Sequence, residues 1–165
     1  MSKYKIIDTN VLIAANGRET HADLKCQLSC MEAIESVVLK DIVLLDNLGL
    51  ILDEYSTYCS YKGDPGVGDA FFKHVFDNQS VQSKCLVFKI TRDPYEENNF
   101  IEFPNSPDLV KFDPSDRKFI AVSVSSKLDP HIYNATDSDW ELFKPALQKE
   151  KIVVIQLCPQ HATKD

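Results

Sequence analysis

Four acidic residues in this 165-residue sequence lie beside apolar sequence, where a carboxylate needs a partner: Asp8, Glu54, Asp116 and Asp137. If they share a partly desolvated pocket, their repulsion amounts to several kcal/mol unless protons or a cation neutralise them. Oxygen ligands suit Mg²⁺ or Mn²⁺, which retain waters that can be activated. Such an ion polarises a phosphoryl oxygen and lowers the pKa of an attacking water. The residue types therefore predict hydrolysis of a phosphodiester bond.

Two of these acids are expected at the ends of strands. The apolar run from Tyr4 to Asp8 ends in Asp8-Thr9-Asn10, after which a helix can begin at Val11. The run from His131 to Ala135 is closed by Thr136-Asp137-Ser138-Asp139, and Ser138 or Asp139 can cap a helix that runs to about Lys149. Asp8 and Asp137 should therefore lie at the same edge of a parallel sheet.

Glu54 is expected on the inward face of a helix from about Asn47 to Tyr61. At helical spacing it lies beside Leu50, Ile51 and Tyr58, whereas Asp53 falls on the polar side. A carboxylate on the apolar side of a helix requires an explanation, and Glu54 is that carboxylate.

Asp116 is expected in the first turn of another helix. Asp113 is predicted as its N-cap and Pro114 as its first residue, with the helix continuing to about Ser126. Asp116 aligns with Phe119 and Ile120 on the inward face. It is the second inward carboxylate on a helix.

The remaining pattern alternates strands with helices. Such alternation predicts parallel pairing with right-handed crossovers, in a three-layer α/β/α sandwich around a mostly parallel sheet of four to five strands. Ligands of these sheets gather at the carboxyl ends of the strands. We expect one domain over residues 1–158 and a polar tail over 159–165. The further predicted elements are helix 22–39, strand 42–45, helix 69–78 capped by Asp69, strand 86–90 and strand 152–157.

The composition is that of a globular protein, with 44% hydrophobic and 26% charged residues. The net charge of −7 excludes a protein that coats nucleic acid by bulk electrostatics, so a polynucleotide would have to be held locally, for example through a cation. The sequence shows no secretory leader and no apolar run of about 18 residues. We therefore expect a cytoplasmic protein that makes no membrane contact.

The five cysteines are scattered and odd in number, which favours reduced, buried thiols over a disulfide framework. Cys26 and Cys30 are one helical turn apart, and His21 is nearby. A zinc site normally requires a second pair of ligands, so the sequence alone favours buried thiols.

Four segments together resemble the acidic motifs of the PIN-domain ribonuclease family, in the same order. The resemblance covers about residues 4–16, 42–58 and 112–140 and is poor over 61–111. The segments are Ile6-Ile7-Asp8-Thr9-Asn10-Val11-Leu12, Leu52-Asp53-Glu54-Tyr55, Asp113-Pro114-Ser115-Asp116-Arg117-Lys118-Phe119-Ile120-Ala121 and Ala135-Thr136-Asp137-Ser138-Asp139-Trp140.

The resemblance implies an endonuclease that uses Mg²⁺ or Mn²⁺ to cut single-stranded or structured RNA. Such proteins are often toxins of bacterial toxin-antitoxin pairs and often dimers, which implies an antitoxin, another protein or a second copy as partner. The four acids fall on the family's catalytic, metal-binding positions, and Asp139 falls on an optional further acid. Asn10 falls on a site-orienting position. The family commonly has Ser or Thr where this chain has Ala135, and Thr136 or Asn134 is a possible substitute.

Basic residues near the third acid are candidates for contacts with RNA phosphates, although a solvated face explains them as well. Tyr95, Phe100 and Phe103 could stack on unpaired bases or pack in the core. The three basic residues are Lys111, Arg117 and Lys118.

Each acid also has a purely structural alternative. Asp8 could cap the following helix, Glu54 could pair with a lysine, Asp116 could interact with a helix dipole, and Asp137 could shape a turn. An aspartyl phosphatase is disfavoured because it needs a second acid where this chain has Asn10. A protein of the same fold that binds RNA or a protein without cutting remains the alternative function.

Overall fold

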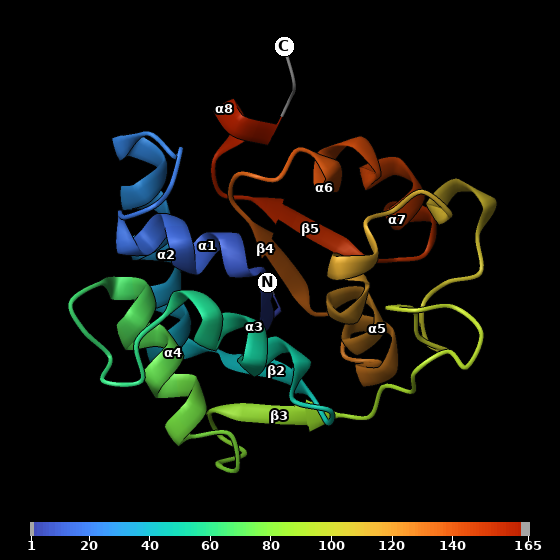
Figure 1. The fold of residues 1–165 in the computed structure, drawn as a ribbon, viewed down its shortest axis with the longest axis horizontal. Helices are drawn as coiled ribbons and strands as arrows, with labels where there is room; N and C mark the ends of the chain where they lie inside the picture. The colour runs from blue at the N-terminus through green and yellow to red at the C-terminus, as the bar shows by residue number, and fades with distance from the viewer. Residues whose placement is uncertain (1, 163–165) are drawn as a thin grey trace.

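A computed structural model of the chain describes residues 2–162, and five parallel strands form one sheet within this range (Figure 1). The order across the sheet is β3-β2-β1-β4-β5. The strands are β1 (Tyr4–Ile7), β2 (Ile42–Asp46), β3 (Cys85–Phe88), β4 (His131–Asn134) and β5 (Val153–Gln156). The prediction of an α/β fold with a parallel sheet is confirmed.

The first strand lies at the centre of the sheet. Lys5 of β1 is opposite Val43 on one side and His131 on the other. Ile6 and Ile7 are fully buried, as expected for a strand that is covered on both faces. The residue that follows this strand, Asp8, therefore enters the middle of the carboxyl edge.

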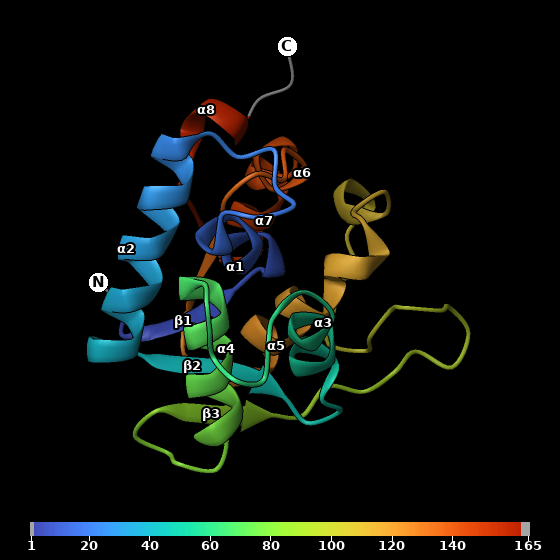
Figure 2. The same cartoon turned by 60° about the vertical axis from the view of Figure 1, so that its left-hand side comes forward.

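Helices cover both faces of the sheet, which gives the expected three layers (Figures 1 and 2). One side carries α1, α2 and α4, with α3 near the carboxyl edge, and the other carries α5, α6 and α7. The bounds are α1 (Thr9–Asn16), α2 (Leu24–Lys40), α3 (Leu50–Tyr58), α4 (Val67–Asp77), α5 (Arg117–Ser126), α6 (Asp139–Leu142) and α7 (Lys144–Lys149).

Two helix predictions are corrected. The helix expected to reach Lys149 is divided at Phe143, because Pro145 lacks the N–H that a continuous helix would use. Asp69 is not the N-cap residue of α4, which is Gly66, although its side chain accepts from the Gly66 N–H at 2.9 Å in a capping box. Asp69 instead lies inside the first turn, where its fully buried carboxylate accepts hydrogen bonds from several other segments.

The C-terminal segment and the cysteines also differ from expectation. Residues Pro159–Ala162 of the expected tail form a short helix, α8, and residues 163–165 lie outside the described part. Cys158, just before α8, forms a disulfide with Cys26 in α2. The expectation of reduced thiols is therefore wrong for this pair. A separation of 132 residues hid the proximity of the two Cα atoms, which are 5.2 Å apart. Over the described residues, the helices are too short or too polar to cross a membrane.

Candidate functional site

One open cavity of about 610 Å³ lies at the carboxyl ends of β1 and β4. It contains all four acids singled out in the sequence, together with three further residues that the sequence placed at the site. These lining residues are Asp8, Glu54, Asp116, Asp137, Asp139, Asn10 and Thr136. Residues from four distant segments therefore meet at one edge of the sheet, as the parallel topology predicts.

Asp8 is held from two directions. It is the N-cap of α1, and its Oδ1 accepts a hydrogen bond from the backbone N–H of Asn10 at 3.0 Å. Its Oδ2 accepts a hydrogen bond of 2.8 Å from the indole N–H of Trp140. Capping is therefore one role of Asp8, but a carboxylate has further lone pairs that these two donors do not use.

Burial and mutual repulsion disfavour ionisation of two acids in the cavity. Burial raises the pKa of Asp8, and the nearby Glu54 and Asp137 raise it further, whereas the Asn10 and Trp140 hydrogen bonds lower it. Burial also raises the pKa of Asp116, and the charges of Asp8 and Asp137 add to this shift. Without a cation, the cavity therefore retains protons near neutral pH.

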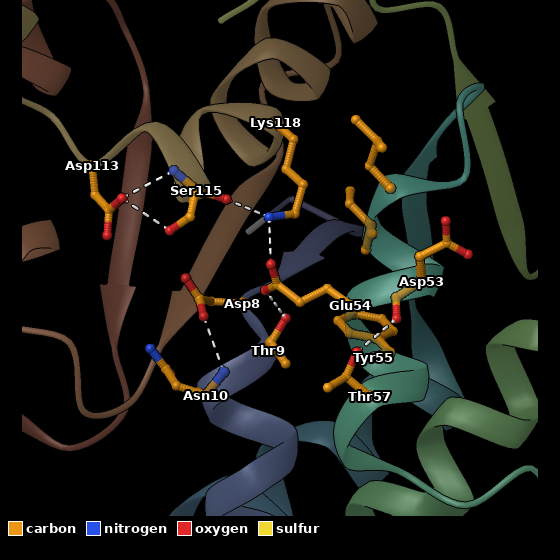
Figure 3. A network of polar contacts seen from close by, with 12 residues as sticks. Asp8, Thr9, Asn10, Asp53, Glu54, Tyr55, Thr57, Asp113, Ser115 and Lys118 are labelled. Atoms are coloured by element: carbon orange, nitrogen blue, oxygen red, sulfur yellow. Dashed lines mark hydrogen bonds and ion pairs between the residues drawn. The ribbon is translucent and has the colours of Figure 1, made fainter. Parts of the chain in front are cut away.

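Glu54 lies between a hydroxyl and an ammonium group (Figure 3). The Thr9 hydroxyl donates to Oε1, and Lys118 Nζ lies 2.6 Å from Oε2. The lysine side chain is 8% exposed and also donates to the carbonyl of Ser115. Asp53 points away from this network, as its place on the polar side of the helix predicted (Figure 3). Glu54 therefore pairs with a lysine, as the structural alternative predicted, and it also lines the cavity.

Replacing Lys118 by methionine is expected to lower the free energy of unfolding by about 1–3 kcal/mol, because the partly buried Glu54 loses its counter-ion. The partial exposure of Glu54 reduces the loss relative to a fully buried pair. Urea denaturation measures the change. Lys111→Met, at an exposed lysine, is the matched control with an expected change near zero. Equal stability of the two variants would show that the ion pair contributes nothing.

Asn10 connects the ends of the two central strands. Its side-chain oxygen accepts from the backbone N–H of Ala135 at 2.9 Å, and its side-chain nitrogen donates to Asn134 Oδ1 at 2.8 Å. The fully buried Asn134 in turn donates to the backbone carbonyl of Asp137. This chain fixes the loop that carries Asp137. Asn134 thus performs the orienting contacts, while Thr136 lines the cavity.

The basic residues proposed for RNA contacts need correction. Arg117 is only 4% exposed, and its guanidinium donates to Glu96, Asn99 and the carbonyls of Val110 and Phe112. Lys118 is engaged by Glu54, so neither residue offers a free cation to a phosphate.

Of the three candidates, only Lys111 is exposed. The aromatic candidates also separate: Phe100 and Phe103 are buried, whereas Tyr95 is 97% exposed.

The donor set of the cavity fits a hard cation. All of the acidic side chains there offer oxygen, and a bound cation would favour the ionised forms of Asp8 and Asp116, whose pKa values are raised by burial and then by the neighbouring acids. The acids surround the cavity rather than meeting at one point. Among the described residues, the group of possible metal ligands whose donor atoms all lie within 4.8 Å of one another consists of three cysteines outside this cavity. An Mg²⁺ or Mn²⁺ ion, which keeps several waters, suits such an open set.

Sequence reasoning missed the residues that orient the acids. Trp140 and Thr9 lie next to the motifs, but neither donor could be assigned to a carboxylate without the fold. Tyr58, His21 and Ser115 also line the cavity and were not assigned to it. One signal could have predicted the Trp140 contact: a tryptophan in an apolar environment is usually buried, and its indole N–H then requires an acceptor, here Asp8.

Comparison with protein-family models finds no family that matches this chain, and comparison with curated proteins finds no significant match. The fold and the site geometry therefore carry the functional argument.

Proposed function

We propose that this protein is an endoribonuclease that depends on Mg²⁺ or Mn²⁺. The observation that carries the proposal is the meeting of Asp8, Asp116 and Asp137 in one cavity, where the pKa values of Asp8 and Asp116 are raised. Buried acids that resist ionisation without a counter-ion are typical of functional sites. The resemblance of the four acidic segments to PIN-domain motifs supports RNA as the substrate.

In this proposal, Asp8, Glu54, Asp116 and Asp137 hold the cation, with Asp139 as a further acid at the rim. A bound Mg²⁺ or Mn²⁺ supplies Lewis-acid polarisation of the phosphate and a lower pKa for the attacking water. Asn10 and Trp140 orient Asp8, and Thr9 and Lys118 hold the Glu54 carboxylate at the cavity wall. The negative walls repel phosphate, so RNA entry depends on charge neutralisation.

Mixed single-stranded RNA incubated with the protein and Mn²⁺ is expected to be cut, and Asp8→Asn is expected to cut it at least about a hundredfold more slowly. The variant removes one negative charge but leaves an oxygen to accept the Trp140 or Asn10 hydrogen bond. Gel electrophoresis of end-labelled RNA measures the rate. A chelator should stop the wild-type reaction. Equal rates for the two proteins would exclude metal-dependent cleavage at this cavity.

One observation favours a second function, the binding of RNA or a protein without cleavage. Lys118 already neutralises Glu54 at 2.6 Å, so one of the four acids has a counter-ion from the protein itself. This alternative predicts that RNA binds with or without Mn²⁺ and remains intact. A gel-shift assay beside the cleavage assay separates the two functions.

We further propose a cytoplasmic role as a toxin or defence nuclease, with an antitoxin or another protein as inhibitor and a second copy as dimer partner. Inducible expression in a bacterial host is expected to arrest growth, and Asp116→Asn to relieve the arrest. Colony counts at matched protein levels measure the effect. Normal growth with active wild-type enzyme would favour a housekeeping role.

A further inference from the structure

Three buried cysteines meet where α2 approaches the end of β5. Cys26 and Cys30 lie one turn apart on α2, and Cys158 lies between β5 and α8. Within residues 2–162, these three form the group of possible metal ligands whose donor atoms all lie within 4.8 Å of one another. None of the three is among the described residues that line the acidic cavity. The cysteines therefore form a second, separate cluster of possible metal ligands.

The sulfur spacing is that of a metal thiolate site. Cys30 Sγ lies 3.8 Å from Cys158 Sγ. Two sulfurs bound tetrahedrally to Zn²⁺ at about 2.3 Å are also about 3.8 Å apart. Cys26 is joined to Cys158 in the oxidised chain, and it enters the same sphere once that bond opens. Cys30 belongs to the hydrophobic core and is fully buried against the pair, so a third sulfur lies beside the disulfide.

A fourth ligand has to come from outside the group of three sulfurs, and α8 carries one candidate. His161 follows Cys158 by one short helical turn, in which its N–H donates to the Cys158 carbonyl at 2.9 Å. Its imidazole reaches the N-cap of α2, Asp23, where Nε2 accepts a hydrogen bond from the backbone N–H at 3.3 Å and lies 3.8 Å from Oδ1. The same oxygen accepts from the N–H of Cys26. To reach the sulfurs as a ligand, the imidazole would have to leave the Asp23 N–H and turn toward them.

We propose that the reduced chain binds one Zn²⁺ through the thiolates of Cys26, Cys30 and Cys158 and the imidazole of His161. Reduction of the Cys26–Cys158 disulfide takes two electrons and two protons from a thiol reductant, as expected in a reducing cytoplasm. Binding then releases three protons from the three thiols. Three sulfurs and one nitrogen form a closed, structural zinc site, which fastens α8 to α2.

Zinc content of protein made in a reducing cytoplasm and purified with a phosphine reductant tests the proposal. We expect about one zinc per chain in the wild type and a loss of more than about tenfold in Cys30→Ser. Cys30 is the decisive position because its substitution leaves the Cys26–Cys158 pair intact. His161→Ala is expected to weaken zinc binding as well. The matched control is Cys59→Ser with Cys85→Ser, which replaces two buried thiols outside the cluster.

Replacement of zinc by Co²⁺ gives a readout that is independent of stability. The wild type is expected to show thiolate-to-cobalt charge transfer and the strong bands of a tetrahedral ion, which an oxygen site at the acidic cavity does not produce. Reduced wild type that takes up neither metal would overturn the proposal. So would Cys30→Ser that binds zinc as wild type does, or alkylation mapping that finds Cys26–Cys158 oxidised in freshly lysed cells. None of these readouts depends on ribonuclease activity.

Discussion

Asp116→Asn is expected to abolish RNA cleavage and, at the same time, to stabilise the folded protein in the absence of divalent cations. Burial and the charges of Asp8 and Asp137 raise the pKa of Asp116, so the folded state disfavours its ionised form. A carboxyl group of this kind contributes most to stability below its unfolded pKa near 4, and that contribution falls as the pH rises. Asparagine removes the penalty at neutral pH and leaves no carboxylate for a cation.

We expect cleavage to fall about a thousandfold or more, which corresponds to about 4 kcal/mol of transition-state stabilisation. We expect the free energy of unfolding at pH 7 in a chelator to rise by about 1–2 kcal/mol. For a chain of this size, each kcal/mol raises Tm by about 2–4 °C. The gain should shrink as the pH falls through about 4 and disappear near pH 3, where Asp116 is protonated in both states.

Asp53→Asn is the control for this variant, because it removes an acid from the polar side of the helix that carries Glu54. It should leave both activity and stability near the wild-type values. If Asp116→Asn lowered stability and left cleavage unchanged, Asp116 would be a structural residue and would not be a ligand of the proposed cation.

Asp69→Asn is expected to cause a large loss of stability, about 3–5 kcal/mol in the free energy of unfolding. The Asp69 carboxylate is fully buried and accepts two hydrogen bonds of 2.8 Å from Arg18. It also accepts from the backbone N–H groups of Ser60 and Gly66. An amide presents an N–H group to these donors and lacks the charge that attracts Arg18, so buried donors lose their acceptor.

The pH dependence of this loss has a definite sign. Burial by itself raises the pKa of Asp69, but the hydrogen bonds from Arg18, Ser60 and Gly66 outweigh burial and lower it. The ionised group therefore stabilises the fold above its unfolded pKa, and the contribution is lost as the pH falls below about 4. The difference between wild type and variant should be full at pH 7 and shrink toward pH 3.

Asp77→Asn, on the same helix, is the matched control in the urea titrations. Asp77 pairs with Lys73 at 2.8 Å, but both side chains are about half exposed, so the expected change is below about 1 kcal/mol. If Asp69→Asn and Asp77→Asn were equally mild, the buried network around Asp69 would not be a determinant of stability.

Local sequence pattern was sufficient for much of the fold. Tyr4–Ile7, which is followed by Asp8, and Ile42–Asp46, which ends in an aspartate, are short and largely apolar runs, and both are strands of the parallel sheet. Asp113 caps a helical segment through the N–H of Ser115, as its place before Pro114 predicted. These features depend on neighbours within a few residues, which is the range over which propensity and capping act.

Local sequence pattern could not predict the contacts between residues that lie far apart in the chain. Helical spacing in the sequence indicated that Glu54 and Asp116, which precedes α5, face inward, but not that Lys118 reaches Glu54 across 64 residues. Lys118 and Arg117 were expected to be exposed because charged side chains usually are, whereas here both are buried and are held by carboxylates and backbone carbonyls. The pairing of Cys26 with Cys158 and the role of Asp69 were missed for the same reason.

The indole of Trp140 and the Asp8 carboxylate that it holds are 132 residues apart in the chain. During translation, Asp8 leaves the ribosome long before its partner Trp140 does. The sheet forms in the same order, because the central strand β1 pairs with β4 on one side and β4 is synthesised much later. A nascent chain that ends before Trp140 therefore lacks a finished site, and any activity of that site begins only after this residue has emerged.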